Sequence, residues 1–238
     1  MKLPIALLAG GLATRLRPVT ETIPKALLEI HRRPFIDHQL ELLASCGARR
    51  VVLCLWHHGE LIRQHIGSGN RFGLEVEYSF DGDSPLGTGG ALKKALPQLG
   101  EAFLVLYGDS YLPCDYAAVE ASFLGSGKEG LMTVYRNQNE GDRSNVVFSG
   151  GRIHAYDKRQ QLPNMEYIDY GLGGLRPAAL EGIPAGQACD LADLYRQLLA
   201  RDQLAGLEVT QRFYEVGSFE GIEAFKHYLL TQGEIKHE

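Results

Sequence analysis

The sequence predicts an α/β fold in which a doubly wound, mostly parallel sheet carries a small antiparallel addition. Three observations predict it. Short, wholly apolar runs recur through the first half of the chain, helical patterns separate them, and the runs after residue 130 are divided by glycine-rich turns. Parallel strands covered on both faces are continuously apolar. Their alternation with helices is typical of a doubly wound sheet.

The first half alternates strands and helices in order. The apolar run 3–8 predicts a buried strand, and the pattern that begins at Pro34 places Ile36, Leu40 and Leu43 on one helical face, ending near Gly47. The same reasoning predicts the elements that follow: a strand at 50–56, a helix at 60–66, a strand at 74–80, a helix at 88–96 and a strand at 102–107.

The second half consists of shorter strands and two capped helices. Asp190 and Ser218 are suitable N-cap residues for helices that bury leucine, isoleucine and phenylalanine. We expect strands at 131–135, 145–148, 152–156, 167–175, 207–209 and 213–216. No repeat or linker divides the chain, so we expect one domain over 1–238.

Composition and charge exclude several classes of protein. Of 238 residues, 45% are hydrophobic and 22% are charged, which excludes a disordered chain and a disulfide scaffold. The net charge of −5 argues against nucleic-acid binding. Residues 1–33 nevertheless hold six basic and two acidic residues. This local excess indicates either an anionic ligand such as phosphate or scattered surface charge.

The cysteines and the N-terminus bear on cellular location. The four cysteines form no CxxC pair, so a zinc or redox motif is not supported and a reduced, cytoplasmic protein is expected. The start of the chain resembles a signal peptide, but Pro4, Gly10 and Gly11 interrupt it. A buried strand followed by a glycine turn explains the apolar start of the chain better than a signal peptide does. No run is long enough for a membrane span.

The turn after the first strand is the first candidate site. Gly10 and Gly11 follow the strand, and Arg15 and Lys25 come next. In open α/β sheets, ligands bind beyond the carboxyl ends of the strands, where glycine amides can approach phosphate. The turn is neither a Walker A loop nor a dinucleotide fingerprint. The two cations could clamp a polyphosphate, or they could be ordinary surface charges.

Several motifs together resemble one family. GGLATRLRP at 10–18, followed by PKALLEI at 24–30, is similar to the signature of the sugar nucleotidylyltransferases. Further similar motifs follow in order over essentially the whole chain: PLGTGGA at 85–91, YGDS at 107–110, DK at 157–158 and YEVGS at 214–218. Among the members of this family, the chain looks most like heptose-1-phosphate guanylyltransferases.

The resemblance implies an activity and a fold. It implies a Rossmann-like, GT-A-like sheet with a nucleotide-binding half at 1–112 and a sugar-phosphate-binding half at 113–238. The implied reaction joins an NTP and a sugar 1-phosphate into an NDP-sugar and pyrophosphate, with Mg²⁺ as cofactor. GTP and a heptose or hexose 1-phosphate are the substrates it favours. A homo-oligomer is a further possibility, with no nucleic-acid or membrane partner.

The resemblance also assigns residues to roles. The expected catalytic residues are Arg15, Lys25 and Asp109, and the expected metal ligands are Asp109 and Glu215. The nucleotide site is expected to comprise Leu8, Ala9, Gly10, Gly11, Thr14, Arg15, Lys25, Asp83, Gly87 and Thr88. The sugar-phosphate site is expected to comprise Tyr107, Gly108, Asn145, Asp157, Lys158, Asp169, Tyr170 and Gly171. The start of the helix behind Gly87 is also expected to favour phosphate.

Four positions depart from the family pattern. Ala13 replaces a glycine, Tyr107 stands where asparagine is frequent, Asp157 shortens a glutamate and Glu215 lengthens an aspartate. None of them removes a charged group from the implied mechanism.

Other functions remain open at this point. A uridylyl- or cytidylyltransferase would use the same motifs. A metal-dependent glycosyltransferase could use Asp81 and Asp83, which form a short DxD sequence. A non-catalytic sugar-nucleotide sensor could keep the fold with the altered positions Ala13 and Glu215. Pyrophosphate release separates the sensor from an enzyme.

Overall fold

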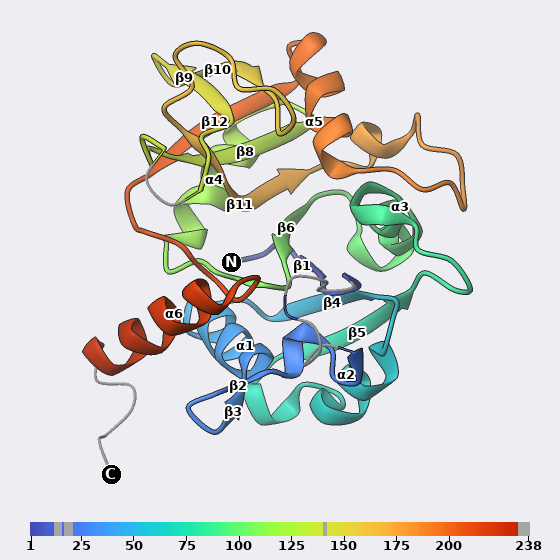
Figure 1. Ribbon diagram of the computed structural model, residues 1–238. Coiled ribbons are helices and arrows are strands. Elements are labelled where there is room, and N and C mark those ends of the chain that lie inside the picture. The colour runs from blue at the N-terminus through green and yellow to red at the C-terminus, as the bar shows by residue number, and fades with distance from the viewer. Residues whose placement is uncertain (12–15, 17–20, 140–141, 233–238) are drawn as a thin grey trace.

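A seven-stranded sheet with the order β12-β8-β11-β6-β1-β4-β5 forms the centre of the molecule (Figure 1). The computed structural model describes residues 1–11, 16, 21–139 and 142–232. The strands of this sheet are β1 (Ile5–Leu8), β4 (Arg50–Leu55), β5 (Glu75–Phe80), β6 (Phe103–Tyr107), β8 (Gly130–Tyr135), β11 (Ile168–Leu175) and β12 (Leu204–Val209).

The pairing confirms the expected doubly wound, mostly parallel sheet. β6, β1, β4 and β5 pair in parallel, and β12 pairs in parallel with β8. β11 lies between β6 and β8 and runs antiparallel to both. The chain winds from β1 to β4 and β5 on one side and then crosses to β6 on the other. Strand order therefore reverses beside β1, which is where open α/β sheets bind their ligands.

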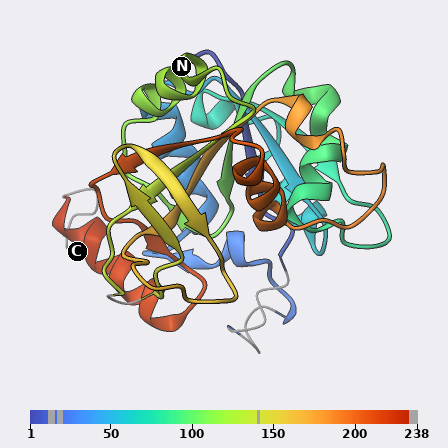
Figure 2. The ribbon, with the colours of Figure 1, turned by 90° about the horizontal axis from the view of Figure 1, so that it is seen from above.

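Helices cover both faces of the sheet because alternate residues of each strand point to opposite sides. Ile5 and Leu7 face a core that α1 (Phe35–Ser45), α2 (Gly59–Ile66) and α4 (Tyr116–Ser126) complete. Ala6 faces a second core, with α3 (Gly87–Leu99) and α5 (Leu191–Ala200). In Figure 2 the hairpin of β9 (Val146–Ser149) and β10 (Arg152–Tyr156) and helix α5 lie toward the viewer. None of the helices in the described part of the chain is both long and apolar enough to cross a bilayer.

A smaller cluster attaches the C-terminal helix α6 (Phe219–Thr231). Phe225 of α6 packs edge-on against Phe35 with ring centroids 5.4 Å apart. Short two-stranded elements complete the fold: β2 (Glu29–Ile30) with β3 (Arg33–Pro34), β7 (Ser110–Tyr111) with β13 (Tyr214–Glu215), and β9 (Val146–Ser149) with β10 (Arg152–Tyr156). Three short 3-10 helices are also described: Lys25–Leu27, Asn70–Phe72 and Pro177–Leu180.

Among the helices, two differ from the sequence prediction. Helix α4 was not predicted; its apolar residues do not form one clear stripe, although the side chain of Asp115 caps it by accepting from the Ala118 amide. Helix α3 continues beyond Pro97 to Leu99, where a break was expected. Leu99 is fully buried in the same core as Leu92, and this burial offsets the hydrogen bond that proline cannot donate.

Candidate active site

A cavity of about 340 Å³ opens where the strand order reverses. The carboxyl ends of β1, β4 and β6 and the first turn of α3 contribute to its wall. Its lining consists of Leu8, Ala9, Gly10, Gly11, Lys25, Ala26, Cys54, Trp56, Asp81, Pro85, Gly87, Thr88, Ala91, Tyr107, Gly108 and Asp109. The strand-end loops predicted to bind the nucleotide therefore meet at one place.

One ion pair lies in this cavity. Nζ of Lys25 is 2.9 Å from Oδ2 of Asp109, and the two side chains are 16% and 33% exposed. Lys25 begins a 3-10 turn after Pro24, and Asp109 follows the end of β6. The residue expected to bind phosphate and the residue expected to bind the metal thus form an ion pair with each other. Both residues line the cavity.

Gly108 allows the turn carrying Asp109 to lie against the end of β1. Its amide donates to the Leu8 carbonyl at 2.8 Å. A Cβ at Gly108 would lie 2.7 Å from that same oxygen and 2.8 Å from Ala9, which is closer than real contacts. Asp109 is anchored from the other side as well, since its carbonyl accepts from the Val216 amide at 2.9 Å. The position of Asp109 is therefore set by backbone contacts on both flanks.

The donor set suits Mg²⁺ bound together with a nucleotide. Among the described residues, no group of three or more histidine, cysteine, aspartate or glutamate side chains comes together. Mg²⁺ is usually held by one or two carboxylates plus substrate phosphates rather than by a cage of protein ligands. Asp109 meets that requirement, because its carboxylate lines the cavity and remains partly exposed.

The backbone of Glu215 lies close to that of Asp109, but the Glu215 side chain forms hydrogen bonds with other residues. It pairs with Ser110 across β13 and β7. Its carboxylate accepts from the Gly217 amide and, at 2.7 Å, from the Ser218 hydroxyl at the start of α6. It lines a second cavity rather than the one containing Asp109. Ligation of a metal by Glu215 stays a prediction.

The start of α3 packs against the segment 187–190. A Cβ at Gly90 would lie 2.6 Å from the Gln187 carbonyl oxygen, so glycine is needed there for protein packing. The amides of Gly89 and Gly90 both donate to the Cys189 carbonyl, at 2.8 and 3.3 Å. These two amides are therefore already paired with protein, and the expectation that the start of this helix favours phosphate stays a prediction.

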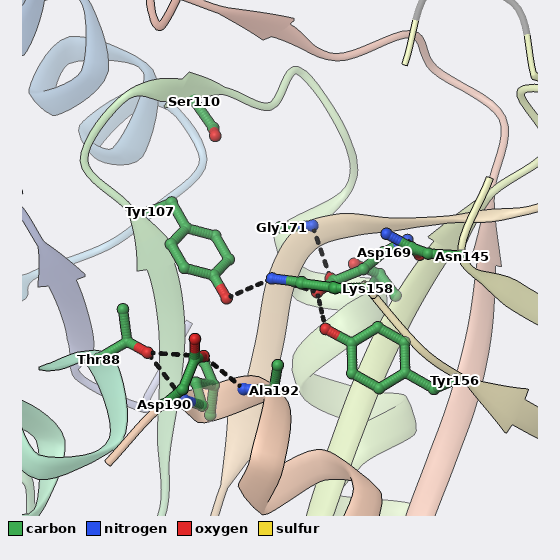
Figure 3. Close-up of polar contacts among 12 residues, drawn as sticks. Thr88, Tyr107, Ser110, Asn145, Tyr156, Lys158, Asp169, Gly171, Asp190 and Ala192 are labelled. Atoms are coloured by element: carbon green, nitrogen blue, oxygen red, sulfur yellow. Dashed lines mark hydrogen bonds and ion pairs between the residues drawn. The ribbon is translucent and has the colours of Figure 1, made fainter. Parts of the chain in front are cut away.

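Thr88 also contacts this segment. Its hydroxyl donates to Oδ1 of Asp190 at 3.3 Å and accepts from the Leu191 amide at 2.7 Å (Figure 3). Asp190 in turn accepts from the Ala192 amide at 2.8 Å. Thr88 thus belongs to the cavity wall and to the N-terminal cap of α5 at once.

A second cluster of polar side chains surrounds Lys158. Figure 3 shows the Lys158 ammonium between the Tyr107 hydroxyl and the Asp169 carboxylate. Its Nζ donates to the Tyr107 hydroxyl at 3.3 Å, lies 3.7 Å from Oδ2 of Asp169, and is 5.1 Å from the centroid of the Tyr107 ring. Burial raises the pKa of Tyr107 well above its usual value, and the carboxylates of Asp169, Asp190 and Asp109 add to this rise. Tyr107 therefore stays neutral, and it connects Lys158 to the cavity that it lines.

Asp169 is the buried member of the cluster. Its side chain is 5% exposed and accepts from the Tyr156 hydroxyl at 3.2 Å and from the Gly171 amide at 3.1 Å. The side-chain oxygen of Asn145 accepts from the Asp169 amide at 2.9 Å. These contacts bring together Asn145, Lys158, Asp169 and Gly171, as expected for one binding site.

Two residues expected in the sugar-phosphate site are placed differently. The Asp157 carboxylate accepts from the Arg159 and Gln160 amides, and these bonds lower its pKa. The Asp157 side chain thereby closes the turn formed by residues 157–160. The Tyr170 ring is 2% exposed and packs against Tyr135 in the core, because it points to the opposite face of β11 from Asp169. Neither side chain joins the cluster around Lys158.

Several expected nucleotide ligands line the cavity and others do not. Leu8, Ala9, Gly10, Gly11, Lys25, Gly87 and Thr88 do so. Asp83 is exposed and lies outside the lining, whereas Asp81 belongs to it. Ala13, Thr14 and Arg15 lie outside the described residues, so their predicted roles stay predictions. Sequence reasoning missed Trp56, although its place directly after β4 was a usable signal.

The fold and this cavity define a nucleotide-binding α/β protein, and comparison with known proteins identifies the family. The model of the Nucleotidyl transferase family matches residues 5–145, which include the loops after β1, β4 and β6. The chain belongs to this family. The predicted resemblance to sugar nucleotidylyltransferases is thereby confirmed at the level of the family.

The names of similar proteins refer to different nucleotides and different sugars. The chain is 29% identical over 217 residues to mannose-1-phosphate guanylyltransferase catalytic subunit beta of Danio rerio, covering 89% of this chain but only 60% of the relative. It is 29% identical over 219 residues to N-acetylmuramate alpha-1-phosphate uridylyltransferase of Neisseria meningitidis, covering 89% of this chain and 92% of the relative. HddC of Yersinia pseudotuberculosis, solved with GMP-PN, shares the fold with a TM-score of 0.77 at 23% identity, over 95% of this chain and 99% of that one.

Proposed function

We propose that this protein transfers a nucleoside monophosphate from an NTP to a sugar 1-phosphate, with release of pyrophosphate. The observation that carries the proposal is Tyr107, which lines the cavity containing Lys25 and Asp109 and whose hydroxyl also contacts Lys158. A triphosphate in the cavity and a sugar phosphate at Lys158 would thus lie on either side of one side chain. Family membership supports the same reaction class.

The chemistry requires two anions to be held together. An oxygen of the sugar phosphate attacks the α-phosphorus, a new phosphorus–oxygen bond forms, and the bond to the β-phosphate oxygen breaks as pyrophosphate leaves. Two unit charges 4 Å apart repel by about 4 kcal/mol at an effective dielectric near 20. Lys25 and, as predicted from the sequence, Arg15 offset this repulsion on the triphosphate side. Lys158 does so on the sugar-phosphate side. No proton has to be removed from the attacking oxygen.

Magnesium completes the charge balance in this proposal. Asp109 would hold it, with Glu215 as the second candidate ligand. When bound, Mg²⁺ neutralises charge on the phosphate oxygens. In this proposal the Asp109 carboxylate stays at the cavity wall and exchanges its ion pair with Lys25 for a bond to the metal.

We propose GTP as the nucleotide, on account of Asp81. Its carboxylate lines the cavity, and the backbone amide of Leu86 donates to Oδ2 at 2.8 Å, which orients the group. A carboxylate only accepts hydrogen bonds. Among the four bases, guanine alone presents two adjacent donors, N1–H and the N2 amino group, on its Watson–Crick edge. The proposed sugar is a heptose or hexose 1-phosphate, as the sequence resemblance suggested.

The glycosyltransferase alternative receives less support. It needs the carboxylates of Asp81 and Asp83 to share a metal, but only Asp81 lines the cavity. A sensor without activity is distinguished by experiment alone.

The test is a matrix of four NTPs against several sugar 1-phosphates with Mg²⁺, scored by pyrophosphate release. We expect turnover with GTP and a heptose or hexose 1-phosphate, and its loss in Asp109→Asn. Asp81→Asn should reduce the preference for GTP over UTP by about tenfold, since a bidentate base contact contributes about 1–3 kcal/mol of discrimination. Asp83→Asn is the matched control. No pyrophosphate release from any pair would refute the proposed activity, and unchanged base preference in Asp81→Asn would refute the role of Asp81.

A further inference from the structure

Gln39 lies on the buried side of α1 and contacts the turn that carries Asp109. The residue is 1% exposed. Its amide nitrogen Nε2 donates to the Tyr107 carbonyl at 3.1 Å and to the Ser110 carbonyl at 2.7 Å. Because carbonyl oxygens only accept, the nitrogen and not the oxygen of the amide must face them. One side chain therefore bridges the backbone on both sides of Gly108 and Asp109.

This contact completes the set that holds the turn. The Gly108 amide donates to Leu8, and the Asp109 carbonyl accepts from Val216. Those two bonds hold Gly108 and Asp109 themselves, whereas Gln39 holds the residues before and after them. The turn is thus attached to β1, to Val216 directly after β13, and to α1.

Burying the side-chain amide of Gln39 destabilises the fold unless its hydrogen bonds to the Asp109 turn compensate. Among the described residues, Oε1 of Gln39 is buried without a hydrogen-bond partner. Leaving a buried acceptor unpaired costs about 1–3 kcal/mol. A methionine or leucine would fill a buried helix position without that cost. The two bonds to the Asp109 turn are what distinguishes glutamine from these residues here.

We propose that Gln39 is a positioning residue that keeps the Asp109 carboxylate aimed into the cavity for the metal–nucleotide complex. The proposal rests on the proposed function for the identity of the ligand. The contact between Gln39 and the turn does not depend on the proposed function. Partners that orient a metal-binding carboxylate typically change metal affinity or activity by about 10- to 100-fold when they are removed.

His38 supplies a matched control on the same helix. It is 5% exposed, and its Nε2 lies 3.1 Å from the Ile30 carbonyl oxygen, which is not part of the Asp109 turn. Replacing either residue with methionine removes a buried donor from a backbone carbonyl. Gln39→Met and His38→Met therefore share the structural cost, and only Gln39→Met releases the turn.

Two measurements test the proposal, and one of them needs no turnover. Hydrogen exchange of peptides covering residues 107–111 should accelerate in Gln39→Met and stay at the wild-type rate in His38→Met. Binding of Mn²⁺, followed by electron paramagnetic resonance in the presence of a non-hydrolysable GTP analogue, should weaken by about tenfold or more in Gln39→Met only. If Gln39→Met fails to fold, Gln39→Leu is measured in the same way.

The outcomes separate this proposal from the proposed function. Wild-type exchange and Mn²⁺ affinity in a folded Gln39 variant would overturn the positioning role, even if the wild-type enzyme releases pyrophosphate. Equal weakening in His38→Met would also overturn it, since a general loss of packing would then explain both. Wild-type protein that releases no pyrophosphate refutes the proposed function, while faster exchange in Gln39→Met still supports the hold on the turn.

Discussion

The Thr88 hydroxyl donates a hydrogen bond to the Asp190 carboxylate, 102 positions further along the chain. Each side chain also accepts a hydrogen bond from a backbone amide in the first turn of α5, Thr88 from Leu191 and Asp190 from Ala192. The cavity wall is thereby joined to a helix of the second half. On the same helix, Arg196 lies 3.8 Å from Asp157, in the turn that precedes Lys158. Helix α5 thus contacts the cavity wall and the residue that precedes Lys158.

Replacing Thr88 should therefore weaken the fold. Thr88→Val keeps the shape but removes the hydroxyl that accepts from Leu191, and loss of an N-terminal cap contact costs about 1 kcal/mol. We expect the free energy of unfolding, measured by urea denaturation, to fall by about that amount. Thr88→Ser should restore it. A Thr88→Val protein as stable as wild type would show that solvent satisfies the α5 amide.

Replacing Lys25 should affect catalysis far more than stability. Its ion pair with Asp109 is partly exposed, and such pairs contribute about 0–1 kcal/mol. Lys25→Met should lower kcat/KM for the NTP by at least about tenfold, because a charge-assisted phosphate contact is lost. Steady-state kinetics and thermal unfolding measure the two effects. The control is Lys226→Met, which removes an exposed ion pair with Glu223 on α6. Near-normal kcat/KM in Lys25→Met would exclude it from the triphosphate site.

Glu215→Gln distinguishes two roles of one carboxylate. As a structural group, Glu215 accepts from Gly217 and Ser218, so its replacement should lower the melting temperature. As a metal ligand, it should also raise the Mg²⁺ concentration needed for half-maximal rate. A Mg²⁺ titration of pyrophosphate release measures the second effect. A lower melting temperature with unchanged Mg²⁺ dependence would leave Glu215 with the structural role alone.

Tyr107→Phe should affect the sugar phosphate selectively. The variant keeps the ring beneath the Lys158 ammonium but removes the hydroxyl 3.3 Å from it. We expect a several-fold rise in KM for the sugar 1-phosphate, equivalent to about 1 kcal/mol for one hydrogen bond. KM for the NTP should change less. Equal changes in both constants would argue that the hydroxyl supports the whole cavity rather than Lys158.

The pH dependence of stability should include a contribution from His38. Burial lowers its pKa from the usual 6.5, so below pH 6.5 the unfolded chain binds a proton that the folded chain does not. Protons then favour unfolding, and stability falls as the pH drops below 6.5. His38→Met lacks this group and should lose less stability between pH 7.5 and 5.5 in urea denaturation. Parallel losses in the two proteins would contradict the assignment.

Local sequence patterns were sufficient for most elements because those elements depend on nearby residues. The apolar runs at 50–56 and 102–107 predicted β4 and β6, and Asp190 and Ser218 were correctly identified as helix caps. The second half was harder. β8, β11 and β12 join the main sheet, whereas β9 and β10 form a separate antiparallel hairpin. Strand patterns do not specify which strand becomes the neighbour.

The sequence by itself determined the family, the alternation of strands and helices, and the motifs that contain Lys25 and Asp109, because motifs and periodicity are local properties of the chain. Only the tertiary structure decided how these residues are partnered. The Lys25–Asp109 ion pair, the packing of Gly90 against Gln187 and the bridge from Gln39 to the Asp109 turn all join residues far apart in sequence. Such contacts depend on how strands and helices pack in space, which no local pattern encodes.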